Sequence, residues 1–285
     1  MRVPSTDGVE LEVHDLGGDG PPLLLAHATG FHGRVWEPLA AELHGFHRWS
    51  LDMRAHGDSH APTDRPLEWY GFADDILSVI DALGLDRPFG VGHSKGAASL
   101  LLAEQARPGT FSALYLFEPV VVPTDFVTGH NPDNPLSNGA RRRRDSFDSF
   151  DDAFENYASK APFDTLHPEV LRLYVDHGFA PSPDGTVSLK CRPENEAEVY
   201  AHGMSHQAFA ALHRVECPVT IALGVEQTVP AIFGRAIADA LPHGSVASFP
   251  ELGHFGPLED PSGIASSIRD SFTDIDHHSD PGAER

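Results

Sequence analysis

A serine flanked by two glycines gives the clearest chemical signal in this sequence. It lies in Gly92-His93-Ser94-Lys95-Gly96, between an apolar run at residues 88–91 and a stretch of small residues at 97–104 that is typical of a helix. A G-x-S-x-G at a strand-to-helix junction holds the serine on a tight turn, where the glycines avoid backbone clashes and the hydroxyl is exposed. The pattern predicts a nucleophilic serine at position 94.

Such a serine needs two further groups, a base within hydrogen-bond reach and a carboxylate that orients the base. His254 lies in a loop at residues 252–259, just before the last expected helix, where it can be delivered to the serine. His27-Ala28-Thr29-Gly30-Phe31-His32 follows the apolar run at residues 23–26, which is the position of an oxyanion loop. Residues 52–59 follow the next apolar run and indicate a structured turn.

These four segments, in this order, resemble those of the α/β-hydrolase family, and the resemblance covers about residues 9–272. It implies that Ser94 is the nucleophile and His254 the general base. It also implies that the backbone N–H groups of Thr29 and Lys95 stabilise the oxyanion of a tetrahedral intermediate. No cofactor and no metal ion is expected in a site of this kind.

The carboxylate that would orient His254 departs from the family's commonest pattern. Members usually carry Asp a few residues after the strand at 219–223, but here Gln227 occupies that place and cannot supply a negative charge. Two carboxylates remain. Glu226 is one residue out of register, and Glu118 ends the preceding strand, where some members of the family carry their acid. We favour Glu118, because a strand end is a more rigid mount than a loop. The alternative for Glu118 is pairing with the inserted segment described below, and for Glu226 a solvated loop acid.

Four neighbouring residues have less certain roles in this scheme. Phe31 and His32 are candidate substrate contacts, with simple loop packing as the alternative. His93 is expected to pack beneath the serine turn. Lys95 stands where a neutral residue is more common, so its charge is expected either to select acidic substrates or to pair with an acid of the inserted segment described below.

The elements that must position these residues follow from hydropathy. Short apolar runs recur along the chain and helical patterns lie between several of them, which predicts an α/β fold with a mostly parallel sheet and helices on both faces. The helical pattern at residues 71–83 has its apolar side chains on one face. The runs lie at residues 23–26, 47–51, 89–92, 113–117 and 219–223.

The alternation of apolar runs with helical patterns stops between residues 123 and 213, where the sequence becomes charged and rich in proline. This composition predicts an inserted helical cap, with helices near residues 140–161 and 168–178. Residues 1–122 and 214–275 then form the hydrolase core. Residues 276–285 are expected to be a flexible tail.

Charge and hydropathy limit the partners. A net charge of −22 argues against nucleic acid, because phosphate binding needs clustered Lys and Arg. No run has the length of a signal core or a membrane span, so a cytoplasmic location and no membrane partner are expected. Cys191 and Cys217 form no metal pattern and are expected to be reduced. No feature of the sequence indicates an oligomeric state.

The sequence thus predicts a serine hydrolase that cleaves an ester or related small acyl compound through an acyl-enzyme. Because a fold and a set of catalytic groups do not fix the chemistry, acyl transfer, C–C hydrolysis or a lyase reaction are alternatives. A non-catalytic binding protein of the same fold is a further alternative.

Overall fold

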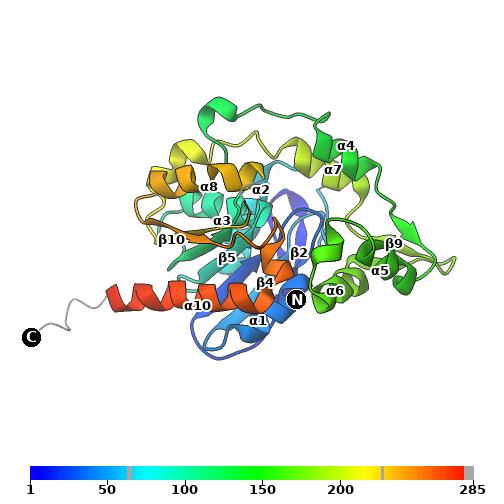
Figure 1. Ribbon diagram of the computed structural model, residues 1–285, viewed down its shortest axis with the longest axis horizontal. Helices are drawn as coiled ribbons and strands as arrows, with labels where there is room; N and C mark the ends of the chain where they lie inside the picture. The colour runs from blue at the N-terminus through cyan, green and yellow to red at the C-terminus, as the bar shows by residue number, and fades with distance from the viewer. Residues whose placement is uncertain (63–65, 226–227, 279–285) are drawn as a thin grey trace, which may run out of the picture.

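An eight-stranded sheet forms the centre of the molecule, with helices on both of its faces (Figure 1). The computed structural model describes residues 1–62, 66–225 and 228–278. The strand order is β1-β2-β4-β3-β5-β6-β10-β11. The strands are β1 (Arg2–Pro4), β2 (Glu10–Asp15), β3 (Pro22–Ala26), β4 (His47–Asp52), β5 (Phe89–His93), β6 (Leu114–Phe117), β10 (Val219–Leu223) and β11 (Gly244–Ser248).

From β4 to β11 in this order all neighbouring strands are parallel, whereas β2 pairs in the antiparallel sense with both β1 and β4. The predicted α/β fold with a mostly parallel sheet is therefore confirmed. Parallel strands place their carboxyl ends at one edge of the sheet. The segments after β3, β4, β5 and β6, which carry the candidate site residues, consequently meet along that edge.

Alternate side chains of β3 enter two different hydrophobic cores. Leu24 packs in the core under α2, α3 and α8, whereas Leu23 and Leu25 pack in the core under α1 and α10. Since successive side chains point to opposite faces, a strand covered on both sides needs a continuous apolar run. The helices are α1 (Glu37–Glu42), α2 (Trp69–Leu83), α3 (Lys95–Ala106), α8 (Val229–Ala240), α9 (Gly256–Glu259) and α10 (Pro261–His278).

Residues 123–213, here called the cap, lie beside the carboxyl edge of the sheet (Figure 1). The cap contains the helices α4 (Pro135–Arg141), α5 (Phe150–Ala158), α6 (Pro168–Gly178) and α7 (Pro193–Ala201). It also contains a three-stranded antiparallel sheet, in the order β7-β9-β8. Its strands are β7 (Ser146–Phe147), β8 (Phe179–Pro181) and β9 (Val187–Leu189).

This small sheet corrects the expectation of a purely helical cap. The stretch expected to be helical at residues 140–161 is divided by β7, and a hairpin joins β8 to β9. The hairpin turns at Gly185, which has a φ of +90° and thus a backbone conformation that favours glycine. Ser182 and Thr186 close the turn, because the Ser182 N–H donates to the Thr186 carbonyl over 2.8 Å.

The carboxyl-terminal boundary also differs from the expectation. Helix α10 continues to His278, so residues 276–278 are helical rather than part of a flexible tail. Residues 279–285, the rest of the expected tail, lie outside the described residues.

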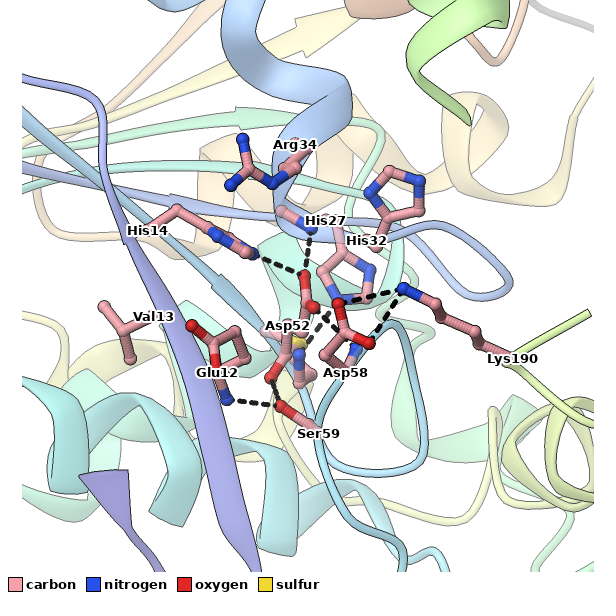
Figure 2. Close-up of polar contacts among 12 residues, drawn as sticks. Glu12, Val13, His14, His27, His32, Arg34, Asp52, Asp58, Ser59 and Lys190 are labelled. Atoms are coloured by element: carbon pink, nitrogen blue, oxygen red, sulfur yellow. Dashed lines mark hydrogen bonds and ion pairs between the residues drawn. The ribbon is translucent and has the colours of Figure 1, made fainter. Parts of the chain in front are cut away.

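Asp52, at the end of β4, organises the turn that follows (Figure 2). Its carboxylate accepts hydrogen bonds from the Gly33 N–H over 2.7 Å, the Asp58 N–H over 2.8 Å and the His14 Nε2 over 3.0 Å. Burial alone would raise the pKa of Asp52, but the hydrogen bond and charge of His14 hold it well below its ordinary value. Asp52 therefore serves as a buried turn anchor, in agreement with the structured turn expected at residues 52–59.

Asp58 connects the same turn to the cap. Lys190, directly after β9, lies 2.8 Å from Asp58 Oδ1 through its Nζ (Figure 2). Farther along the boundary, the Trp69 indole N–H donates to the Val199 carbonyl over 2.9 Å. Two polar contacts thus attach the cap to the core on either side of the candidate site.

Candidate active site

Ser94 lies on a strained turn between β5 and α3. Its φ is +54° and its ψ −113°, a conformation that non-glycine residues rarely adopt. A Cβ at Gly92 would lie 2.7 Å from the Ala97 N, and one at Gly96 would lie 2.1 Å from the Ala26 carbonyl oxygen. Both glycines are thus required by close backbone approach, which is the physical basis of the G-x-S-x-G pattern.

Ser94, His254 and Glu118 form one continuous chain of hydrogen bonds. His254 Nε2 lies 3.1 Å from Ser94 Oγ, and His254 Nδ1 lies 2.5 Å from Glu118 Oε2. A proton on Nδ1 is donated to the carboxylate, which leaves Nε2 to accept the serine hydroxyl proton. The structure therefore brings together a serine, a base and a carboxylate in the order required to activate the serine.

Glu118 is fully buried directly after β6 and has a φ of +43°. Besides His254, it accepts hydrogen bonds from the Gly224 N–H over 3.0 Å and from the Thr228 hydroxyl over 2.8 Å. These donors satisfy a carboxylate that is removed from water. Its partners belong to the core and not to the cap. Glu226, the alternative acid, and Gln227 lie outside the described residues.

His93 and Glu259 hold the His254 loop in place. The sequence had assigned neither residue to this task. The His93 Nε2 donates to the His254 carbonyl over 2.7 Å, and the Gly253 N–H donates to Glu259 Oε2 over 2.8 Å. His93 is fully buried, as expected, but it also supports the base. The adjacency of His93 to Ser94 was the available signal, because a residue beside the nucleophile must lie near the loop that supplies its base.

The loop at residues 27–32, called the oxyanion loop after the role expected for it, is held by its first histidine. The His27 Nδ1 donates to the Ala28 carbonyl over 2.7 Å, and its Nε2 accepts the Met53 N–H over 3.0 Å. Burial lowers the pKa of His27 well below its ordinary value, which keeps the ring neutral for both bonds. Thr29 is next in this loop. Lys95 begins α3, so its N–H has no acceptor within the helix.

A pocket of about 500 Å³ lies between this loop and the cap. Thr29, Gly30 and Phe31 line it from the core, as does Phe255, the residue after His254. The cap supplies the rest of the wall, namely Pro135, Leu136, Gly139, Ala140, Arg143, Asn156, Tyr157, Lys160, Ala161, Pro162, Phe163, Glu196 and Tyr200. The pocket is thus a predominantly apolar cavity that reaches the loop at residues 27–32 and the residue after His254, although Ser94 and His254 themselves do not line it.

His32 does not line this pocket, which agrees with loop packing, the alternative to substrate contact for this residue. Only 2% of His32 is exposed, and its Nε2 donates to the Tyr174 carbonyl of α6 over 3.2 Å. Burial lowers the pKa of His32 to about 4. His32 therefore joins the oxyanion loop to the cap, whereas Phe31 faces the cavity.

Arg143 is the principal charged group of the cavity wall. Its Nη1 lies 2.5 Å from Glu196 Oε2, and its Nη2 donates to the hydroxyls of Tyr157 and Tyr174 over 2.9 and 2.6 Å. Glu196 thus neutralises the guanidinium. The sequence assigned no role to Arg143, because nothing local indicates which of the four adjacent arginines at residues 141–144 turns inward.

The Lys95 side chain follows neither of its two expected roles. It is fully buried, it does not line the pocket, and its Nζ lies 4.2 Å from the ring centroid of Phe72 without a hydrogen-bond partner among the described residues. Burial lowers the pKa of Lys95 from its ordinary value of 10.5 to about 7. An unpartnered amine of this kind lowers the stability of the folded state.

Comparison with known proteins agrees with this geometry. The model of a family described as the alpha/beta hydrolase family matches residues 23–267. The chain belongs to the alpha/beta hydrolase family. A solved structure, that of E-2-(acetamidomethylene)succinate hydrolase, superposes on this hydrolase chain with a TM-score of 0.81, at 22% identity over 96% of this chain and 98% of the other.

Among curated relatives, two match this alpha/beta hydrolase over most of their length. The bifunctional esterase/perhydrolase DCH of Acinetobacter calcoaceticus is 25% identical over 93% of this chain and 97% of its own. The 2-hydroxymuconate semialdehyde hydrolase of Pseudomonas sp. (strain CF600) is 24% identical over 94% and 92%. Human monoglyceride lipase is 30% identical, but the match spans only 35% of each chain.

Within the described residues, no helix is long and apolar enough to span a membrane.

The buried amine gives a prediction for Lys95→Met. Below pH 7 the folded chain carries the full cost of the buried charge, whereas between pH 7 and 10.5 folded Lys95 is neutral while the unfolded chain still binds the proton. The cost therefore falls as pH rises, and we expect Lys95→Met to stabilise the protein by on the order of 4 kcal/mol near pH 7 and by little near pH 10. Urea unfolding measures both, with the exposed Lys160→Met as control. A gain that does not change with pH would contradict the assignment.

Proposed function

We propose that this chain is a serine hydrolase that cleaves an ester or related small acyl compound through an acyl-enzyme on Ser94. The observation that carries the proposal is the unbroken hydrogen-bond chain from Ser94 Oγ through His254 to Glu118. A non-catalytic protein of this fold would have no need to keep a strained serine, a base and a buried carboxylate in line. The geometry therefore favours an enzyme over a binding protein.

In the proposed reaction, Ser94 Oγ attacks the acyl carbon while its proton passes to His254 Nε2. Glu118 keeps the imidazole oriented and stabilises the imidazolium that forms. The backbone N–H groups of Thr29 and Lys95 are the proposed donors to the oxyanion. His254 then gives its proton to the leaving group, and a water molecule activated by His254 hydrolyses the acyl-enzyme.

The pocket supports a small-molecule substrate. Its volume of about 500 Å³ falls within the range of roughly 300–1,000 Å³ that is usual for such sites. Apolar groups such as Leu136 and Phe163 dominate its wall. Of its two cations, Arg143 is paired with Glu196, whereas Lys160 is exposed to solvent. These features favour an uncharged acyl or alcohol group in the cavity.

C–C hydrolysis is the second candidate, because a relative that matches over nearly its full length is a 2-hydroxymuconate semialdehyde hydrolase. The same serine and histidine would serve either reaction. A panel that contains a short-chain aryl ester and 2-hydroxymuconate semialdehyde separates them, since the two kcat/KM values rank the substrates directly.

A fluorophosphonate probe tests the nucleophile. We expect the wild-type chain to be labelled, Ser94→Ala to be unlabelled, and His254→Ala to be labelled far more slowly, because the hydroxyl then lacks its base. Hydrolysis of an aryl ester should fall by at least about 10⁴-fold in either variant. Turnover that survives both substitutions would refute the mechanism.

The acid is tested by a matched pair of variants. We expect Glu118→Gln to lower kcat by on the order of 10³-fold or more, because the imidazolium loses its orienting charge. Glu226→Gln should keep wild-type activity. Steady-state kinetics at pH 7 to 8 measures both, with circular dichroism to show that each variant is folded. The reverse ranking would assign the role to Glu226.

Gly139 allows the pocket itself to be tested. It lies in α4, lines the cavity, and a Cβ there would meet nothing within 4 Å. Gly139→Phe should therefore fill the cavity and raise KM for a bulky aryl ester about tenfold or more, without loss of stability, since glycine is a poor helix former. Gly139→Ala is the control. Unchanged KM in Gly139→Phe, with fluorophosphonate labelling intact, would show that the substrate binds elsewhere.

A further inference from the structure

Three side chains of metal-ligating type converge on the outer side of the cap. Glu198 and His202 lie four residues apart in and directly after α7, and His130 comes from the segment that begins the cap. Both His130 Nε2 and His202 Nε2 lie 3.1 Å from the same atom, Glu198 Oε1. All three ligand atoms lie within 4.8 Å of one another.

The spacing of these atoms suits a tetrahedral zinc ion. Ligands at about 2.1 Å from Zn²⁺ in tetrahedral geometry are separated from each other by roughly 3.4 Å. The 3.1 Å distances to Glu198 Oε1 are close to this value, so a small outward shift of the side chains accommodates the ion. Two imidazoles and one carboxylate are a donor set that zinc accepts.

The backbone holds His130 in position against α7. The Asn131 N–H donates to the Ala201 carbonyl over 2.8 Å, and the Thr128 N–H donates to the Met204 carbonyl over 3.1 Å. These two bonds flank His130 on either side. The Asn134 side-chain amide adds a third bond, to the Tyr200 carbonyl over 3.2 Å. The cluster is therefore preorganised by main-chain contacts that do not involve the three ligating groups.

One of the three side chains is buried and the other two are partly exposed, so the proposed site is open to solvent on one side only. The His202 side chain is 8% exposed, whereas those of Glu198 and His130 are 34% and 44% exposed. An ion can thus enter from solvent on the His130 side and rest against a buried imidazole. A water molecule can complete the coordination on the open side.

We propose that His130, Glu198 and His202 bind a divalent transition-metal ion, with Zn²⁺ as the favoured ion, and that this ion joins the segment at residues 128–131 to α7. The proposed metal site is separate from the cavity, since neither His130 nor Glu198 nor His202 lines the pocket. Its role is structural. Glu196 and Tyr200 of the same helix do line the pocket, so the ion stabilises one wall of the cavity.

The sequence had predicted no metal site. Glu198 and His202 are four residues apart, but a single glutamate–histidine pair at this spacing is not a metal motif. The third ligand lies 68 residues before Glu198. Only the folded cap brings it into place.

Zinc binding to the untagged chain, stripped with a chelator, tests the proposal by isothermal titration calorimetry. We expect one equivalent of Zn²⁺ to bind to the wild type and to be lost or weakened about 100-fold or more in His130→Ala and His202→Ala, because changes to mere outer-shell partners cost 10- to 100-fold. Glu198→Gln should weaken binding as well. His213→Ala, which removes an exposed histidine away from the cluster, is the matched control.

Thermal unfolding gives a second readout that does not depend on enzyme activity. Free Zn²⁺ at 100 times its Kd should raise the folding equilibrium constant of the wild type about 100-fold and thus raise Tm, whereas Mg²⁺ should not. The three variants should lose the zinc-dependent shift while His213→Ala keeps it, with circular dichroism to show folding. Equal zinc binding by the wild type and by His130→Ala and His202→Ala would overturn the proposal. So would a wild type that binds no zinc.

Discussion

The buried carboxylate of Glu118 is the contact on which the arrangement of the candidate site depends. It joins the end of β6 to the end of β10 through Gly224, to the start of α8 through Thr228, and to the His254 loop. A carboxylate without water must have donors on its oxygens, so these three segments cannot separate without leaving a buried charge unsatisfied. The same bonds that stabilise this edge of the sheet therefore orient the histidine.

The cap and the core together form the wall of the pocket. The oxyanion loop forms one wall of the pocket, and His32 attaches that loop to α6 while Phe31 turns toward the cavity. Arg143 and Glu196 join the segment after α4 to α7 at the cap side of the pocket and neutralise one another. The cavity is thus shaped by polar contacts at its boundary and is apolar within, an arrangement that fixes its form without requiring a charged ligand.

Much of the fold followed from local patterns. The apolar runs predicted the parallel strands, and the glycines at 92 and 96 predicted the serine turn, because close backbone approach excludes a Cβ at both positions. The small sheet of the cap was missed, since its strands are only two or three residues long and carry no period that can be recognised. Substrate contact and loop packing both remained open for His32, because nothing local shows that its ring turns toward α6.

By itself, the sequence determined the sheet, the serine turn and the short set of groups that could assist the serine, because strand burial and tight turns depend on neighbouring residues. Only the tertiary structure decided which of these groups meet. The contact between Glu118 and His254 joins positions 136 residues apart, and that between Ser94 and His254 joins positions 160 apart. The burial of the Lys95 amine and the meeting of His130 with α7 were decided in the same way. Such distances depend on how whole elements pack, which no local pattern records.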